Sequence, residues 1–181
     1  MIYNTPTKDE DGMYHVKAVN DDNKRCFVQL SNVVISDVDV DSGEVSFEVT
    51  SEDNQAKLAT IHDSNTNAAV ENSKEWFGKQ LSEKTIHGAY TREGDISTDK
   101  IEATRIFDSE KQAVDFEKLV SGMTCSIFVE FAGIWFAKKA FGPTWNLVQV
   151  KIHEEEITPE PTEPEIEAYP DQYMFEDDIS K

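Results

Sequence analysis

The sequence of 181 residues has few cations, two cysteines and no long apolar run. Seventeen Lys and Arg side chains stand against 36 Asp and Glu, which gives a formal net charge of −19. Two cysteines outside any CxxC pair are too few for a disulfide framework and fit a reducing compartment. No segment approaches the ~20 consecutive apolar residues of a membrane span, and the N-terminus lacks a secretory signal. We therefore expect an intracellular protein that is not secreted and does not contact a membrane.

The local motifs of common enzyme classes are also absent. The sequence has no Gly-rich phosphate loop, no GxSxG, no HExxH and no Cys paired with a patterned His. Its four histidines are isolated: His15, His62, His87 and His153. We predict a non-enzymatic protein without a cofactor, although a catalytic site assembled only by the fold stays open.

One acidic run has the alternation of a metal-binding loop. Asp37, Asp39 and Asp41 alternate, as ligands do in a calcium-binding EF-hand, but the sixth position holds Ser42 where that loop needs glycine. The flanking residues are typical of strands rather than helices. We predict a hairpin here and no metal site.

The last sixth of the chain differs in composition from the rest. Residues 153–181 carry eleven acidic side chains against Lys181, and they alternate Pro with Glu. Such a segment buries too little apolar surface to offset the entropy of ordering, so we predict a disordered acidic tail. Its end mixes rings with carboxylates, which favours docking to a partner over simple solubilisation. The predicted docking residues are Tyr169, Tyr173, Phe175, Asp177 and Asp178.

Residues 1–152 are typical of a single mainly β domain. Strand-like alternation covers 13–19, 24–35, 45–49, 100–107, 124–136 and 146–152, with turn residues between several of these runs. Residues 71–90 favour short helical pieces, and 109–122 fit a helix or a loop nearly equally. Five or more strands with a short helical insertion predict a small Greek-key barrel or sandwich.

An aromatic and lysine-rich stretch, GIWFAKKAFGPTWNLVQVKI, covers residues 133–152. Alternation puts Val148, Val150 and Ile152 on a core face and leaves Trp145 beside Lys151 on the other face. Phe27 next to Arg25 repeats this pairing on an earlier strand. Rings that stack on bases beside cations that meet phosphates are typical of proteins that bind single-stranded nucleic acid. The alternative is that these rings fill the core. The predicted DNA-binding residues are Arg25, Phe27, Trp135, Lys138, Lys139, Trp145 and Lys151.

Two blocks of the sequence resemble a known family. The blocks are ENSKEWFGKQLSEKTI at 71–86 and, further on, GIW at 133–135 with FGPTWNLVQVKI at 141–152. They are similar to the single-stranded DNA-binding proteins of nucleocytoplasmic large DNA viruses, a group distantly similar to those of short-tailed coliphages. The matching positions are Asn72, Ser73, Trp76, Phe77, Gly78, Lys79, Phe141, Gly142, Trp145 and Gln149.

The resemblance implies an OB-fold barrel that coats single-stranded DNA during viral replication and recombination in the infected cell, in a viral factory or the nucleus. It also implies a tail that recruits a polymerase or helicase. One property departs from this picture, because residues 1–152 still carry 25 acidic against 16 basic side chains, whereas phosphate binding ordinarily requires a basic footprint. A viral interaction or virion protein with a barrel that does not bind DNA is the alternative. The sequence leaves the oligomeric state open, a homodimer included.

Overall fold

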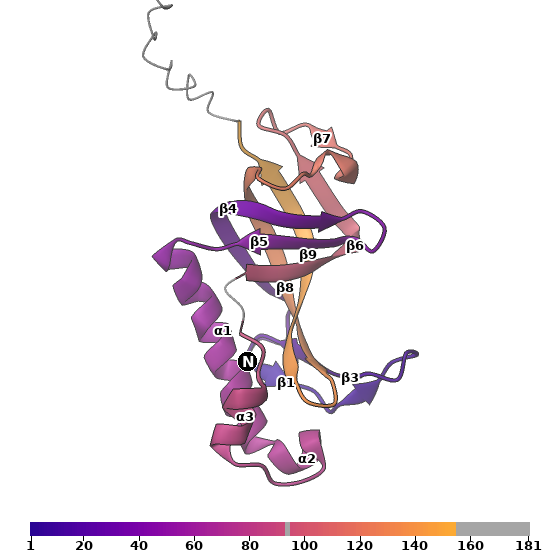
Figure 1. Ribbon diagram of the computed structural model, residues 1–181, viewed down its shortest axis with the longest axis vertical. Coiled ribbons are helices and arrows are strands. Elements are labelled where there is room, and N and C mark those ends of the chain that lie inside the picture. The colour runs from indigo at the N-terminus through magenta and orange to yellow at the C-terminus, as the bar shows by residue number, and fades with distance from the viewer. Residues whose placement is uncertain (93–94, 155–181) are drawn as a thin grey trace, which may run out of the picture.

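The computed structural model describes residues 1–92 and 95–154 (Figure 1). Most of the predicted disordered tail, residues 155–181 with Tyr169, Tyr173, Phe175, Asp177 and Asp178, lies outside the described residues. Within the described part, no helix combines the length and apolar character that crossing a membrane requires.

Five strands close into a barrel, which occupies the upper half of Figure 1. Their bounds are β4 (Cys26–Asp39), β5 (Glu44–Glu48), β6 (Asp95–Phe107), β8 (Thr124–Phe136) and β9 (Phe141–Ile152). β4 pairs with β5, β5 with β6, β6 with β9, β9 with β8, and β8 returns to β4. Only the β6–β9 pair among these is parallel. This closed order is that of an OB-type Greek-key barrel and confirms the predicted mainly β fold.

The barrel has an apolar core because alternate side chains of its strands point inward. Cys125, Ile127, Val129 and Phe131 of β8 are all buried, as their alternation predicts. The first two barrel strands meet in the predicted hairpin, where Gly43 adopts a positive φ of 77°. In that turn the Asp39 carboxylate accepts the backbone N–H groups of Asp41 and Ser42, so the acidic run caps a hairpin.

Several bulges and register shifts interrupt the alternation, and three of them bear on the faces discussed below. β4 has one extra residue between Leu30 and Val33, where Asn32 takes a left-handed φ of 54°. β8 has one between Phe131 and Gly133, and β9 has one at Val148, between the partners of Phe128 and Val129. Each bulge exchanges the inward and outward faces of the strand beyond it. This exchange decides which aromatic rings of the chain reach solvent.

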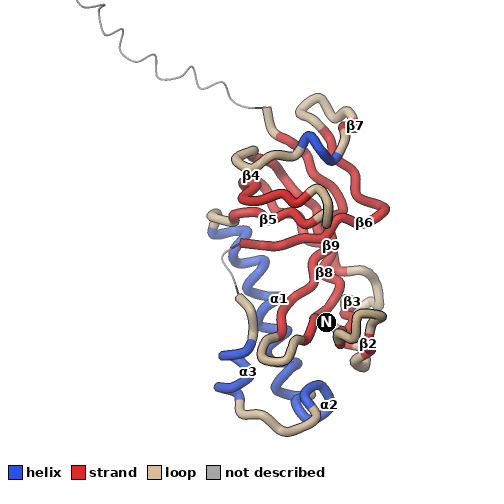
Figure 2. Tube along the Cα trace, turned by 45° about the vertical axis from the view of Figure 1, so that its right-hand side comes forward, coloured by secondary structure: helices blue, strands red, loops and turns tan. Residues whose placement is uncertain are grey.

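A helical insertion lies between β5 and β6, and Figure 2 shows its helices gathered along one side of the strands. It comprises α1 (Glu52–Glu71), α2 (Ser73–Phe77) and α3 (Glu83–Ala89). The two short helices fall in the region predicted to be helical, and Gly78 ends α2 in a left-handed conformation. The 20-residue α1 is a feature that the sequence analysis did not predict.

The first helix also covers an exposed strand edge. The Asn54 side chain of α1 accepts the Ser31 backbone N–H at 3.4 Å and donates to the Ser31 carbonyl at 2.7 Å. Lys57 donates to the Gln29 carbonyl at 2.8 Å. These side chains occupy backbone groups of β4 that would otherwise be open to another strand.

Beyond the barrel, β8 and β9 continue as an extension that we call the distal hairpin, residues 132–144. It reaches the lower part of Figure 1, where it pairs with β3 (Tyr14–Val19). β3 in turn pairs with β1 (Ile2–Tyr3) and β2 (Thr7–Lys8). Gly133 permits this contact, because a Cβ there would lie 1.9 Å from the Val16 carbonyl oxygen.

The segment after β6 settles the question left open over residues 109–122. It forms the two-residue β7 (Ala113–Val114), which pairs with β6, and a single 3-10 turn at Phe116–Lys118. The helix alternative for this region was therefore wrong, and the loop alternative is confirmed.

Candidate nucleic-acid interface

Two phenylalanine rings stack on the outside of the barrel. Phe27 of β4 and Phe128 of β8 have ring centroids 5.3 Å apart and planes inclined by 22°. Phe27 is 46% exposed and Phe128 is half-buried. The strand register places Gln29 opposite Phe128, and Gln149 of β9 on the other side of it. We call this surface the stacking face; its residues are Phe27, Gln29, Phe128, Gln149 and Lys151.

Phe128 is a site residue that the sequence analysis missed. The inward alternation from Cys125 to Phe131 implies that Ser126, Phe128 and Glu130 point outward. The sequence holds a signal for Phe128, because its ring falls on an outward position of a strand and Phe27 falls on an outward position of another.

Cations flank the stacking face on one side. Lys151 is exposed and pairs with Ser126, two residues from Phe128. Arg105 of β6 lies opposite Gln149 and is exposed, and its guanidinium donates to the carbonyls of Glu102 and Thr104, both at 2.9 Å. Arg105 is also absent from the predicted set. Its backbone hydrogen bonds hold a positive charge beside the face.

Arg25, a predicted phosphate contact, is paired with a carboxylate. Its Nη1 donates to both oxygens of Glu130, at 3.2 and 3.3 Å, and Asn146 Nδ2 also donates to Glu130, at 3.3 Å. The Glu130 side chain is only 10% exposed, whereas that of Arg25 is 69% exposed. Part of the Arg25 charge is therefore used to neutralise a carboxylate that is almost fully covered.

Trp145 is not on the outer face, and its predicted stacking role is wrong. The residue is 3% exposed inside the barrel, where its ring contacts that of Phe131 at a centroid distance of 5.3 Å. The cause is the bulge at Val148. It puts Trp145 and Leu147 inward before the bulge and Val150 inward after it, while Gln149 and Lys151 point out. An uninterrupted alternation along β9, as predicted from the sequence, places Trp145 and Leu147 on the outer face, whereas the bulge puts them inside.

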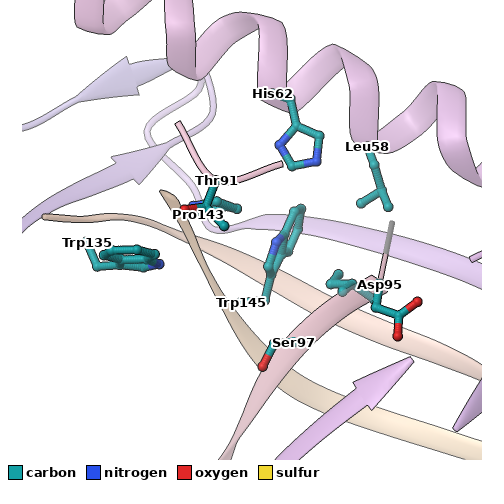
Figure 3. A pocket seen from close by; sticks show the side chains of 9 residues that line it. Leu58, His62, Thr91, Asp95, Ser97, Trp135, Pro143 and Trp145 are labelled. Atoms are coloured by element: carbon teal, nitrogen blue, oxygen red, sulfur yellow. The ribbon is translucent and has the colours of Figure 1, made fainter. Parts of the chain in front are cut away.

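Trp135 is half-buried in the distal hairpin. Its ring lies over Gly142 of the paired strand, where a Cβ would come within 3.0 Å of Trp135 Cζ2. Figure 3 shows Trp135 and Trp145 with His62 around a cavity of about 220 Å³ between α1 and the strands. Burial lowers the pKa of His62 to about 4, with the nearby charge of Arg92 as a further cause. The cavity is therefore lined by a neutral imidazole.

The remaining predicted lysines lie apart from the stacking face. Lys138 and Lys139 are exposed in the turn at the tip of the distal hairpin, which Figure 1 shows at the opposite end from the barrel loops. At ~3.3 Å per strand residue, the tip is roughly 25 Å along β8 from Phe128. The structure thus places Phe27 and Arg25 side by side at β4 and Lys151 on the same outer face further along β9, while the two turn lysines lie apart from this face.

The two motif blocks of the sequence meet in one packing cluster. The Phe77 ring of α2 contacts those of Phe136 and Phe141 at centroid distances of 5.7 and 5.3 Å, and the Trp76 ring contacts that of Phe136 at 5.7 Å. Tyr90 completes the contacts around Phe141 at 5.2 Å. We call this the aromatic cluster; its residues are Trp76, Phe77, Tyr90, Phe136 and Phe141. These motif positions therefore join the helical insertion to the distal hairpin.

Acidic and histidine side chains do not assemble a metal centre in the part of the chain that the structure describes. Within residues 1–92 and 95–154, no group of three or more His, Cys, Asp or Glu side chains has an arrangement that could hold a metal ion.

Three solved structures are similar to this chain, all of the single-stranded DNA-binding protein from bacteriophage Enc34. A C-terminal truncation has a TM-score of 0.49 at 13% identity, and the protein in complex with ssDNA has 0.47 at 14%; each comparison covers 82% of this chain and 94% of the other. A third structure has 0.48 at 13%, covering 84% and 89%. Likenesses of this size do not by themselves identify a function. No curated protein sequence matches.

A family model matches over residues 31–177, which include most of the barrel, the helical insertion and most of the acidic tail. Its description is "Family of unknown function (DUF5871)". Because the match covers most of the sequence, the chain belongs to this family.

Proposed function

We propose that this protein binds single-stranded DNA, without catalysis, on the outer face of β4, β8 and β9. The observation that carries the proposal is the stacked Phe27–Phe128 pair, which is exposed on an OB-type barrel beside Lys151 and Arg105. Bases stack on such rings regardless of sequence, at about 1–3 kcal/mol per base. The strand faces of OB barrels are a common place for oligonucleotide binding.

The acidic composition of the domain limits how much phosphate contacts can contribute to DNA binding on this face. Lys151 on this face and Arg105 beside it have no carboxylate partner in the described contacts, whereas Arg25 pairs with Glu130. Binding then depends mainly on stacking and little on neutralised phosphates. For single strands each neutralised phosphate contributes about −0.7 to the slope of log affinity against log salt, so two cations give a slope of about −1.4.

The experiment is a titration of a fluorescein-labelled, mixed-sequence single strand, followed by fluorescence anisotropy at several salt concentrations. We expect saturable binding with the shallow slope given above, and weaker binding of the same sequence as a duplex, whose bases are already stacked. No binding of the single strand at low salt would contradict the proposal and favour an interaction or virion protein that keeps the barrel without DNA binding.

We further propose that the protein acts in the replication and recombination of a large DNA virus. This proposal is supported by the resemblance of residues 71–86, 133–135 and 141–152 to the proteins of such viruses. In it, Tyr169, Tyr173 and Phe175 of the acidic tail recruit a polymerase or helicase. Affinity purification from infected cells, with full-length protein and protein ending at residue 154, tests it. Replication proteins retained equally by both forms would contradict a role for the tail.

A further inference from the structure

A carboxylate sits beside the stacking face in a position that stacking alone does not explain. Glu130 lines a surface groove of about 500 Å³ together with Lys17, Arg25, Thr144 and Asn146. Burying a carboxylate costs free energy even when an Arg compensates it, and an apolar residue of similar size would avoid that cost. The presence of this carboxylate at the proposed interface raises the question of which chemical group it recognises.

The register fixes where Glu130 lies relative to the exposed ring. Phe27 of β4 and Glu130 of β8 are directly opposite each other in the antiparallel pair. Side chains in such pairs have Cβ atoms about 4.5–5.5 Å apart. The Glu130 side chain is 10% exposed, at the groove described above, so the edge of a base stacked on Phe27, or of the next base along the strand, would have to enter this groove to meet the carboxylate.

The carboxylate has acceptor capacity left for such an edge. An ionised carboxylate offers about four lone-pair positions and no donor. Three long hydrogen bonds, from Arg25 and Asn146 at 3.2–3.3 Å, occupy part of this capacity. The same bonds hold the carboxylate in place, so a base edge would meet an acceptor that is already oriented.

We propose, on the basis of the function inferred above, that Glu130 makes the site select bases whose edges carry an amino group, and so disfavour thymine. Cytosine, adenine and guanine carry one exocyclic amino group each, and Glu accepts from that of cytosine in known base contacts. The thymine edge has a single N–H between two carbonyl oxygens, and those oxygens would face the carboxylate. The stacking rings tolerate any base, whereas the carboxylate beside them does not.

The test compares labelled oligonucleotides of about twelve nucleotides, a length within the usual range of OB-fold sites. Oligo(dC) and oligo(dT) are both pyrimidine strands, and anisotropy at one salt concentration and mildly alkaline pH gives their affinities. We expect the wild-type protein to bind oligo(dC) roughly five- to 150-fold more tightly, as one good base contact implies. Oligo(dU), which lacks only the methyl group of thymine, should behave like oligo(dT).

The variant Glu130→Gln tests the residue itself. An amide both donates and accepts, so the preference for oligo(dC) should shrink to within about twofold. Release of Arg25 should also raise the affinity for oligo(dT). Glu102→Gln, an exposed acid on β6, is the matched control and should keep the wild-type preference. A urea melt of each variant establishes that it is folded.

Each result has one meaning. Equal binding of oligo(dC) and oligo(dT) by the wild-type protein, or oligo(dU) binding like oligo(dC), overturns the inference while leaving single-strand binding intact; these arms need no variant. A preference that survives in folded Glu130→Gln overturns the assignment to Glu130. Failure to bind any of the strands overturns the proposed function instead.

Discussion

The molecule holds its aromatic rings in two very different settings. In the aromatic cluster, Phe141 touches rings from α2, the end of α3 and its own hairpin, and it is almost fully buried. On the stacking face, Phe27 stacks on Phe128 and leaves nearly half of its surface open to solvent. Of the four aromatic residues in the stretch 133–152, Phe136 and Phe141 belong to the aromatic cluster, and Trp145 is buried in the barrel. A dense run of rings therefore marks packing here, and the exposed pair is sparse in sequence.

Truncating a ring inside the barrel should give the largest effect on stability. Trp145→Ala removes a 3% exposed side chain that packs on Phe131, so we expect a loss of about 3–5 kcal/mol in the free energy of unfolding. Urea denaturation followed by circular dichroism measures this loss. A variant with nearly wild-type stability and weakened DNA binding would instead return Trp145 to the interface.

The β-barrel was predictable because its strands follow simple alternation between turn residues. The side-chain faces beyond a bulge were not, since one extra residue at Val148 exchanges inside and outside without any local mark in the sequence. The helix α1 was hidden for another reason. Its buried stripe contains Asn54, His62, Asn65 and Thr66, so it lacks the apolar periodicity that identifies a helix.

The polar groups buried under α1 form a connected chain of hydrogen bonds. Tyr3 donates to Asn65 Oδ1 at 2.7 Å, Asn65 Nδ2 donates to the Tyr90 hydroxyl at 2.9 Å, and that hydroxyl lies 2.7 Å from His62 Nδ1. Burial raises the pKa of Tyr90 to about 12, so its hydroxyl keeps its proton. Because the Tyr90 oxygen already accepts from Asn65, the hydroxyl can donate a hydrogen bond to Nδ1 of a neutral His62. A neutral His62 completes the chain, and a protonated one would break it.

Acidification should therefore lower the free energy of unfolding, because His62 must stay neutral in the folded chain. The pKa of His62 is lowered from 6.5 to about 4 in the folded chain, so between these values the unfolded chain binds a proton that the folded chain does not. The contribution is fully present above pH 6.5 and is lost as pH falls toward 4, by about 2 kcal/mol at pH 5. Urea melts at pH 7.5, 6 and 5 measure it. His62→Gln should lose less stability on acidification than wild type, and exposed His87→Gln should match wild type; equal losses in all three would contradict the assignment.

Truncating the exposed ring of Phe27 should have the opposite outcome to the one expected for Trp145→Ala, with a larger effect on binding than on stability. Phe27→Ala should weaken single-strand binding by about 1–3 kcal/mol, the contribution of one stacked base. Its unfolding free energy should fall by only about 1 kcal/mol, through loss of the contact with Phe128. Tyr14→Ala removes an equally exposed ring on β3, away from the stacking face, and should leave binding unchanged. Equal losses of affinity in both variants would show that no particular ring binds the bases.

The acidic tail should give the smallest effect, because it acts through screened charge. β9 ends at Ile152, one residue beyond Lys151, so residues 153–181 begin at the margin of the stacking face. If DNA binds at this face, a tethered segment with eleven acidic side chains and its own rings would compete with it there at a high effective concentration. Ending the chain at residue 154 should tighten single-strand binding by no more than about tenfold at low salt, and the gain should shrink at physiological salt, where the Debye length is about 8 Å.

An excess of the isolated tail peptide should displace DNA from the shortened protein, and the same peptide with Tyr169, Tyr173 and Phe175 replaced by Ala should do so less well. Unchanged affinity at every salt concentration would mean that the tail does not compete at this face. Its rings would then be free for a partner whether or not DNA is bound.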